Sequence, residues 1–272
     1  MHHNTDRSHT RHAGSGPRHD AFRAHLRSRE FTIGTFLKTP SSIVTEVVGL
    51  SDLDVVCFDA EHAPFGRLET DRCIAAARAA DMPSLVRVAG HSPHDIRNAL
   101  DSGATGVLVP HVCTAEQADQ LVRASRFGEG GRGYAGSPRA AGYGTKPMAQ
   151  HREDSARQTT LIVQIEDIAA LDHVEAIANT DVDALFIGRA DLAVAMDKPV
   201  NDAAVIDTVA QICKTAAAAG KAVGMFTPRL DELPDWRAMG ASLFLLGSDH
   251  GFLLQGANAL ANTARQSLKP SE

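Results

Sequence analysis

The sequence contains little cysteine, and its cysteines form no motif. Of 272 residues only 4 are cysteines, and their spacing matches neither a CxxC pair nor a set of zinc ligands. They are Cys57, Cys73, Cys113 and Cys213. Cysteine used so sparingly is typical of a reducing compartment, where disulfides do not persist, and we expect a cytoplasmic protein.

Long apolar runs and an excess of positive charge are absent as well. No stretch approaches the roughly 20 apolar residues that a membrane-spanning helix needs, so we expect no membrane partner. Lys and Arg together number 27 against 33 for Asp and Glu, which gives a formal net charge of -6 and argues against a nucleic-acid partner. A chain of this length can bury an ample core, either as one large α/β domain or as two small ones.

Residues 1–20 contain almost nothing apolar. Their polar residues include His2, His3, His9, His12 and His19. We expect this His-rich leader to be disordered, and it lacks the apolar core of a signal peptide. Residues 21–272 are predicted to form a single domain.

Several catalytic motifs are missing. There is no GxSxG elbow and no P-loop, which argues against a serine hydrolase or an NTPase. A Schiff-base aldolase needs a lysine desolvated inside the fold, but every lysine outside the leader falls in a predicted loop or helix. These are Lys38, Lys146, Lys198, Lys214, Lys221 and Lys269.

Apolar runs predict eight strands that alternate with eight helices. The strands are Phe31–Phe36, Asp54–Asp59, Ser84–Val88, Gly106–Val109, Leu161–Glu166, Asp183–Ile187, Ala222–Phe226 and Ser242–Leu246. The helices are Ile43–Leu50, Leu68–Ala80, Pro93–Asp101, Ala115–Arg126, Ile168–Ala178, Ala203–Ala219, Leu230–Met239 and Phe252–Ala264. Strict βα alternation is the pattern of a (β/α)8 barrel; a doubly wound open sheet is the structural alternative.

One connection is unusually long. A glycine-rich loop over residues 128–144 and an extra helix over Pro147–Arg157 separate the fourth helix from the fifth strand. Its GxGxxG match at residues 131–136 follows a helix rather than a strand, which argues against dinucleotide binding. The loop either brings Arg132 or Arg139 towards an anionic substrate or is simply solvated.

Two carboxylates follow neighbouring predicted strands. Glu166 ends one strand and Asp191 comes a few residues after the next, so both should lie at the carboxyl ends of parallel strands, where α/β folds bind ligands. Because side chains alternate, Gln164 and Glu166 share one face of their strand. A divalent cation between the two acids is the functional interpretation. The structural alternative is that each acid caps a helix or turn.

Polar residues also mark the ends of two earlier strands. His62 follows the second strand within Asp59-Ala-Glu-His, a position suited to a general base. Asp59 and Glu61 could orient its imidazole or join the polar web of the site, and His62 could instead be an ordinary surface residue. Arg87 lies inside an apolar strand, which predicts either an anion-binding role or a structural ion pair.

Together these segments resemble the HpcH/HpaI family of metal-dependent pyruvate aldolases, which includes the 4-hydroxy-2-oxoheptanedioate and 2-keto-3-deoxy-glucarate aldolases. The resemblance runs from about Phe31 to Ala264. It rests on Ile33–Phe36, Asp59–Pro64, Val86–Arg87, Leu100–Gly106, Val109–Pro110, Val163–Glu166, Phe186–Leu192 and Gly247–Asp249.

The resemblance implies both a reaction and roles for particular residues. The reaction is cleavage or formation of 4-hydroxy-2-oxo acids, giving pyruvate and an aldehyde through a metal-bound pyruvate enolate. Glu166 and Asp191 would bind Mg²⁺, Mn²⁺ or Co²⁺. His62 would assist the base, with Asp101 of a neighbouring subunit raising its basicity, and Arg87 would steady the enolate.

By the same resemblance, Gln164 and the segment from Gly188 through Arg189 and Ala190 to Asp191 would hold pyruvate. Asp59 would belong to the catalytic web. The implied fold is a barrel of the phosphoenolpyruvate/pyruvate-domain type with an exchanged C-terminal helix. The implied assembly is a homo-oligomer, a hexamer built as a trimer of dimers.

One position departs from the family, which usually has Pro where this chain has Arg189. A cation there would favour an additional carboxylate on the substrate or would pair with a nearby acid. Two other functions stay open: an acyl-CoA-using or citrate-synthase-like lyase on the same barrel, and a barrel without catalytic activity.

Overall fold

The eight predicted strands close into a parallel barrel. In the computed structural model, which describes residues 18–268, the strands follow one another in chain order and the first pairs with the last. They are β1 (Thr32–Leu37), β2 (Val55–Asp59), β3 (Ser84–Arg87), β4 (Gly106–Val109), β5 (Thr160–Ile165), β6 (Ala184–Ile187), β7 (Ala222–Phe226) and β8 (Leu243–Ser248). The predicted barrel is confirmed, with small shifts at the strand ends, and the open sheet is wrong.

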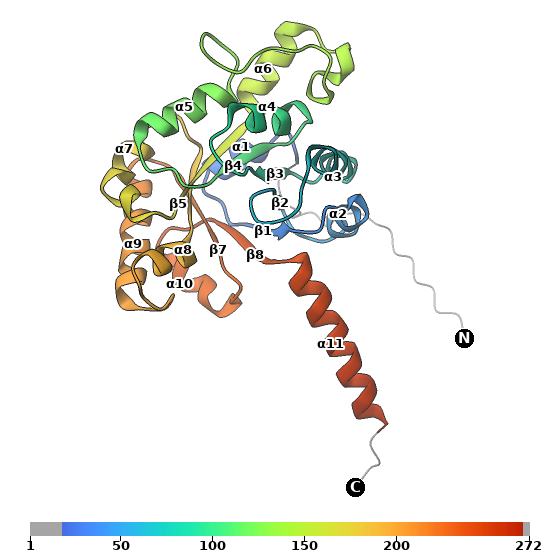
Figure 1. Cartoon of the computed structure of the whole chain (residues 1–272), viewed down its shortest axis with the longest axis vertical. Coiled ribbons are helices and arrows are strands. Elements are labelled where there is room, and N and C mark those ends of the chain that lie inside the picture. Colours follow the sequence, from blue (N-terminus) through green and yellow to red (C-terminus); the bar gives the residue numbers. More distant parts are fainter. Residues whose placement is uncertain (1–17, 269–272) are drawn as a thin grey trace, which may run out of the picture.

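Helices surround this barrel (Figure 1). They are α1 (Phe22–Arg27), α2 (Ser42–Gly49), α3 (Arg67–Ala79), α4 (Pro93–Asp101), α5 (Ala115–Ser125), α6 (Met148–Gln158), α7 (Val174–Ala178), α8 (Arg189–Ala195), α9 (Ala203–Ala218), α10 (Leu233–Ala238) and α11 (Asp249–Ser267). The sequence did not predict α1 or α8. The predicted helices over residues 168–178 and 230–239 each begin with a 3-10 helix, η2 (Ile168–His173) and η3 (Leu230–Glu232).

Alternation along the strands divides the core in two. One set of side chains fills the barrel interior: Phe36, Val55, Cys57, Leu85, Leu108, Ile162, Ala184, Phe186, Ala222, Leu243 and Leu245. The other set, which includes Val163 and Ile165 of β5, packs outwards with residues of the helices. Since Ile162 points inwards, Gln164 and Glu166 do so too, at the carboxyl end of the barrel.

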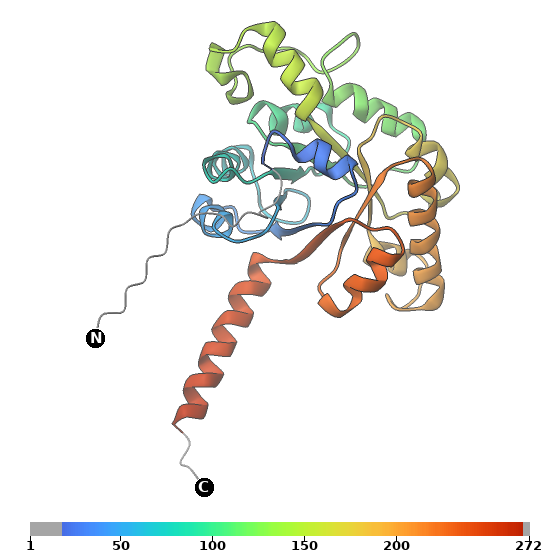
Figure 2. The ribbon, with the colours of Figure 1, turned by 180° about the vertical axis from the view of Figure 1, so that it is seen from behind.

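Helix α1 closes the opposite end of the barrel. Phe22 and Leu26 are fully buried among the interior side chains, and Figure 2 shows α1, in blue, lying over the middle of the barrel. Arg23 of α1 donates a 2.8 Å hydrogen bond to Asp183, which is buried just before β6. The same carboxylate accepts 2.8 Å from the N–H of Leu161 and forms ion pairs with Arg27 and Arg126. Asp183 therefore connects α1 and the end of α5 to the amino end of the barrel.

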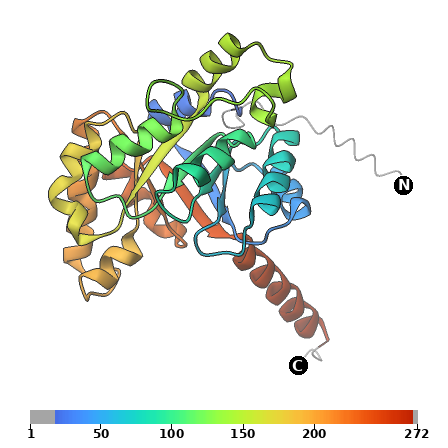
Figure 3. The ribbon, with the colours of Figure 1, turned by 45° about the horizontal axis from the view of Figure 1, so that its top comes forward.

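The long connection between α5 and β5, which Figure 3 shows running outside the barrel, is held by ion pairs. Arg139 lies 2.6 Å from the carboxylate of Asp71, and Arg132 hydrogen-bonds Asp101. The sequence offered two interpretations of this loop: that it brings Arg132 or Arg139 towards an anionic substrate, or that it is simply solvated. Neither interpretation describes these two arginines. Within this chain they pair with acids of α3 and α4 and are neither free nor at the carboxyl end of the barrel.

Helix α11 extends away from the barrel (Figures 1 and 2). Within it only Asp249 is buried, and its carboxylate accepts hydrogen bonds from the backbone N–H groups of Lys38 and Thr39. The rest of the helix exposes apolar side chains, which are Phe252, Leu253, Leu254 and Leu260.

Two sequence predictions concern the ends and the surface. The predicted disordered leader of residues 1–20 lies outside the described residues apart from its last three positions. Across residues 18–268, none of the helices combines the length and the apolar character that crossing a membrane requires.

We predict that Asp183→Asn lowers the free energy of unfolding by about 3 kcal/mol or more, because it leaves buried guanidinium groups without their carboxylate. The measurement is the urea midpoint of wild type and variant at one protein concentration. Asp181→Asn is the matched control, since Asp181 is exposed and pairs with Arg27 alone. It should change the stability by less than about 0.5 kcal/mol. Equal urea midpoints for the two variants would contradict the stabilising role of Asp183.

Candidate active site

Polar side chains gather at the carboxyl ends of the strands, the end at which barrels of this kind carry their active sites. They come from β2, β3 and β5 or from the residues that follow β1, β2, β4, β5 and β6: Lys38, Asp59, Glu61, His62, Arg87, His111, Gln164, Glu166 and Asp191. Eight of the ten residues predicted for the site lie in this region, on or just after the second, third, fifth and sixth strands, while Asp101 and the side chain of Arg189 do not face it.

Asp59 and Arg87 form the base of one side of the site. Two nitrogens of Arg87 donate to the two oxygens of Asp59 at 3.0 and 2.8 Å, and the guanidinium stacks 4.5 Å from the Phe36 ring. Lys38 lies 3.2 Å from the same carboxylate. Burial opposes ionisation of Asp59, but its hydrogen bonds with Arg87 and the charges of Arg87 and Lys38 lower its pKa. The structural ion pair suggested by the sequence is therefore present.

Glu61 links the predicted residues to one another. Its carboxylate lies 3.3 Å from Arg87, 3.6 Å from His62 and 3.6 Å from His111. Its Oε2 is buried and has no hydrogen-bond partner among the described residues. Glu61 thus joins the polar web, as the sequence suggested, and it retains an oxygen that can accept a further interaction.

Glu166 is a buried carboxylate at the end of β5. Its Oε1 accepts a 2.9 Å hydrogen bond from the backbone N–H of His111, and its Oε2 accepts one from Gln164. The helix-cap alternative for Glu166 is therefore wrong. Burial raises the pKa of Glu166, and the nearby charge of Asp191 adds to this effect against the opposing hydrogen bonds of His111 and Gln164.

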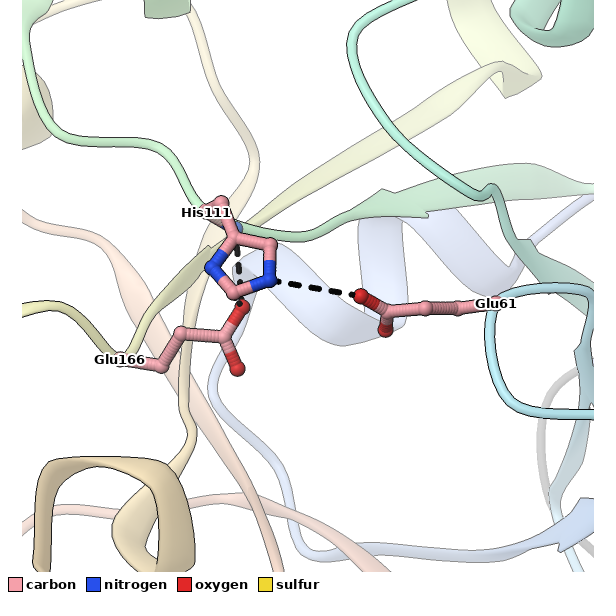
Figure 4. Close-up of side chains that lie close together, drawn as sticks. All are labelled: Glu61, His111 and Glu166. Carbon is pink, nitrogen blue, oxygen red and sulfur yellow. Dashed lines mark hydrogen bonds and ion pairs between the residues drawn. The ribbon is translucent and has the colours of Figure 1, made fainter. Parts of the chain in front are cut away.

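His111 was not predicted as a site residue. It follows β4 and Pro110 in a left-handed backbone conformation, with φ 57°, which is uncommon for a residue other than glycine and is typical of functional sites. Figure 4 shows its ring between Glu61 and Glu166. Burial opposes the charged imidazole, but the carboxylates of Asp167, Glu166 and Glu61 raise the pKa of His111.

The donor set fits a divalent cation. One ligand atom from each of Glu61, His111 and Glu166 lies within 4.8 Å of the others, and carboxylate and imidazole donors suit Mg²⁺, Mn²⁺ and Co²⁺. Oε2 of Glu61 lies 3.3 Å from Arg87 and 3.6 Å from His62, so it is the raised pKa of Glu166 that indicates negative charge that the protein itself does not fully neutralise. Asp191 is close enough to act on Glu166 electrostatically, and it is exposed in the first turn of α8.

The turn from β6 into α8 requires glycine at position 188. A Cβ on Gly188 would lie 2.6 Å from the Cβ of Glu166 and 3.2 Å from Nε2 of Gln164. The absence of a side chain therefore lets the two polar residues of β5 occupy the mouth of the barrel. Gln164 Oε1 is buried there without a hydrogen-bond partner in the described part of the chain.

Arg189 pairs with a nearby acid, which is the second of the two roles considered for it. Its side chain is only 7% exposed, donates a 2.8 Å hydrogen bond to Glu232 and stacks 4.8 Å from the Trp236 ring. Trp236 also donates to Glu232. The guanidinium is thus paired with Glu232 of η3 and stacked on Trp236 of α10, and substrate binding by Arg189 stays a prediction. Ala190, the next residue, is exposed.

His62 and Asp101 do not meet within one chain. The imidazole of His62 is exposed, and its backbone N–H donates a 3.1 Å hydrogen bond to Asp59. Asp101 ends α4, at the opposite end of the barrel, where it binds Arg132. Any contact between these two residues requires a second subunit, as the resemblance implies.

Two residues of the mouth, His111 and Lys38, were missed for different reasons. The position of His111, directly after the fourth predicted strand, was an available signal of the same kind that identified His62. Lys38 was set aside because it lies outside a strand, and it does lie just beyond β1. Its ammonium nevertheless reaches Asp59, and an ion-paired lysine is not the desolvated amine that Schiff-base chemistry needs.

Comparisons with known proteins agree with this geometry. Residues 32–255 match the model of a family described as HpcH/HpaI aldolase/citrate lyase. The chain is 34% identical over 249 residues to proteins named 5-keto-4-deoxy-D-glucarate aldolase from Salmonella arizonae and Escherichia coli O157:H7, and these alignments cover 90% of this chain and 96% of each relative.

Solved structures are similar over the same range. An HpcH/HpaI aldolase/citrate lyase family protein from Burkholderia cenocepacia J2315 superposes with a TM-score of 0.85 at 31% identity, covering 90% of this chain and 99% of that one. Citrate synthase SbnG superposes with a TM-score of 0.80 at 27% identity, covering 90% and 97%.

We predict that Asp59→Asn destabilises the protein by about 3 kcal/mol at pH 7, because Arg87 loses its buried partner. The pKa of Asp59 is lowered on folding, so its stabilising effect is present above the ordinary value of 3.8 and is lost as the pH falls below it. Urea midpoints between pH 7 and pH 3 should therefore converge for wild type and variant. The exposed Asp52→Asn serves as control. A difference that did not change with pH would rule out this electrostatic role.

Proposed function

The chain belongs to the HpcH/HpaI aldolase/citrate lyase family, and from this premise we propose that it is a metal-dependent pyruvate aldolase that cleaves 4-hydroxy-2-oxo acids. As a member of this family it is a lyase of the aldolase type. The observation that carries the proposal is the buried Glu166 at the mouth of the barrel, with a raised pKa and with Glu61, His111 and Asp191 around it.

Glu166 and Asp191 are the proposed ligands of a divalent cation, Mg²⁺, Mn²⁺ or Co²⁺. Their support is the position of both acids after adjacent strands and the electrostatic effect of Asp191 on Glu166. His111 and Glu61 are the alternative or additional donors. When bound, such a cation supplies a Lewis acid that stabilises negative charge developing on a substrate oxygen.

The remaining residues move the proton and hold the substrate. His62 is the proposed base that takes the proton from the C4 hydroxyl group, after which the C3–C4 bond breaks and the aldehyde leaves. Arg87, fixed by Asp59, faces the charge that develops on the 2-oxo group of the pyruvate half. The proposed pyruvate contacts are Gln164 and the backbone from Gly188 to Ala190. Gln164 would use its amide oxygen, which has no hydrogen-bond partner among the described residues, or its amide nitrogen after a flip of the amide group.

The substrate class rests on the relatives. Two of them are named 5-keto-4-deoxy-D-glucarate aldolase, so we propose a 2-oxo acid of this polyhydroxy type, with pyruvate and a small aldehyde as products. Because Arg189 is already paired with Glu232, it is not the residue that selects a second carboxylate on the substrate.

A second function has support from one solved structure. Citrate synthase SbnG shares the fold at 27% identity, which keeps a citrate-synthase-like or acyl-CoA-using reaction as the alternative. The two are separated by substrate: the aldolase releases pyruvate without CoA, whereas the alternative consumes an acyl-CoA.

We also propose a homo-oligomer, a hexamer with exchanged C-terminal helices, in the cytoplasm. Helix α11 leaves the barrel with Phe252, Leu253 and Leu260 exposed, and α2 exposes Ile43 and Val47 on one face. A second copy of the chain would bury these apolar surfaces. Assembly would also be needed to bring a neighbour's Asp101 to His62.

We predict that the purified protein releases pyruvate from 5-keto-4-deoxy-D-glucarate without CoA, that EDTA abolishes this activity, and that Mn²⁺ or Mg²⁺ restores it. The measurement is pyruvate formation coupled to lactate dehydrogenase. Activity that survives thorough chelation would refute the metal role, and citrate formation from an acyl-CoA in place of pyruvate release would favour the alternative.

Binding of Mn²⁺, followed by electron paramagnetic resonance, separates the ligand sets in the same preparation. Glu166→Gln and Asp191→Asn should each weaken Mn²⁺ binding by about 100-fold, an effect of the size expected for loss of a directly coordinating carboxylate. Asp167→Asn is the control, because Asp167 contacts His111 rather than the proposed cation. If His111→Ala weakened Mn²⁺ binding as much as Glu166→Gln did, and Asp191→Asn left it unchanged, then Glu61, His111 and Glu166 would be the ligands.

A further prediction concerns assembly. Leu253→Lys combined with Leu260→Lys, two substitutions on one face of α11, should dissociate the oligomer that the wild type forms, as measured by analytical ultracentrifugation. Asn258→Lys introduces a lysine at a polar position of the helix and should leave the oligomer intact. A monomeric wild-type protein would contradict the proposed exchange.

A further inference from the structure

A second cavity lies at the opposite end of the barrel from Glu166. Its volume is about 230 Å³. Its wall includes Thr105 and Thr159, which directly precede β4 and β5, so the cavity faces the amino ends of these strands. His19 and Asp20 before α1, Arg78 of α3, and residues of α4, α6 and the loop between α5 and β5 complete it, and none of them belongs to the mouth of the barrel.

Two buried nitrogens in this wall have no partner. His151 is 3% exposed and Arg132 is 6% exposed, and both line the cavity. Among the described residues, Nε2 of His151 and Nε of Arg132 make no hydrogen bond. Leaving such a group unpaired costs about 1–3 kcal/mol, so two of them side by side on one wall indicate a missing ligand.

Aromatic packing holds these two side chains in place. The guanidinium of Arg132 stacks 4.6 Å from the ring of Phe127, and the ring of His151 meets the same ring edge-on at 5.3 Å. Tyr134 lies 5.9 Å from His151 and 5.6 Å from Phe127. The backbone N–H of Arg132 is fixed by a 2.7 Å hydrogen bond to the carbonyl of Arg126. The donors are therefore held before any ligand arrives.

The wall of the cavity carries three cations. Arg78 and Lys146 join Arg132 there, beside His151. Two of the nearby acids are engaged, because Asp101 binds Arg132 and Asp154 binds Lys146 and Gln150, and Asp20 also lines the wall. Burial and the positive charges of Arg132 and Lys146 lower the pKa of His151, which is the effect that a bound negative charge would relieve.

We propose that this cavity binds a small oxyanion, a phosphate or carboxylate group, through Nε of Arg132 and Nε2 of His151, with Lys146 as a further contact. The cavity is smaller than the ~300–1,000 Å³ of pockets that hold drug-sized ligands, which restricts it to inorganic phosphate or a short carboxylate metabolite. A guanidinium group suits either, since its planar N–H donors match the oxygens of both. The site stands independently of the aldolase proposal.

Isothermal titration calorimetry of the full-length protein tests this proposal, with inorganic phosphate and malonate as probes at constant ionic strength and without added divalent cation. We expect at least one of the two probes to bind one site per chain, and the stronger probe tells phosphate from carboxylate chemistry. His151→Phe keeps the ring packing and removes the nitrogens, so it should weaken binding by at least about tenfold.

Arg152→Gln is the matched control, because Arg152 is the next residue on α6, is exposed and does not line this cavity. It should bind as wild type does. Lys146→Gln provides a second variant if His151→Phe folds poorly, and it should also weaken binding. Failure of both probes to bind at millimolar concentration, or equal binding by wild type and His151→Phe, would overturn the proposal.

Discussion

Buried charge needs a partner, and this requirement organises both ends of the barrel in different ways. At the amino end, Asp183 is enclosed by Arg23, Arg27 and Arg126 and by a backbone N–H. Three arginines surround one carboxylate there, and their ion pairs hold α1 against the amino end of the barrel. A buried acid so fully paired has no capacity left for a ligand.

At the mouth of the barrel, the carboxylates are less completely paired with cations. Asp59 is neutralised by Arg87 and Lys38, but Glu166 is buried among other acids and its pKa is raised. The same physical rule makes one end of the barrel structural and the other end the candidate site for the proposed cation.

The single chain leaves several surfaces incomplete. Helix α11 carries exposed leucines away from the barrel, Asp101 lies far from the His62 with which the family would pair it, and the cavity beside α6 has unpaired donors. The proposed oligomer would account for the first two and the proposed small anion for the third.

Much of the candidate site could be predicted from the sequence because it depends on local patterns. The βα alternation predicted a closed barrel, and the period of two along a strand predicted that Gln164 and Glu166 point together into its mouth. Arg87 could be recognised because a charge inside an apolar strand requires a buried partner. These inferences need only neighbouring residues along the chain, and for that reason they held.

What the sequence by itself determined is the barrel and the strand ends from which its polar side chains emerge. Only the tertiary structure decided how these side chains pair. His111 enters the site through a left-handed backbone at φ 57°, Arg189 turns to Glu232 across two loops, and Asp101 joins Arg132. Such pairings depend on which distant segments become neighbours when the barrel closes, and no local period or propensity specifies them.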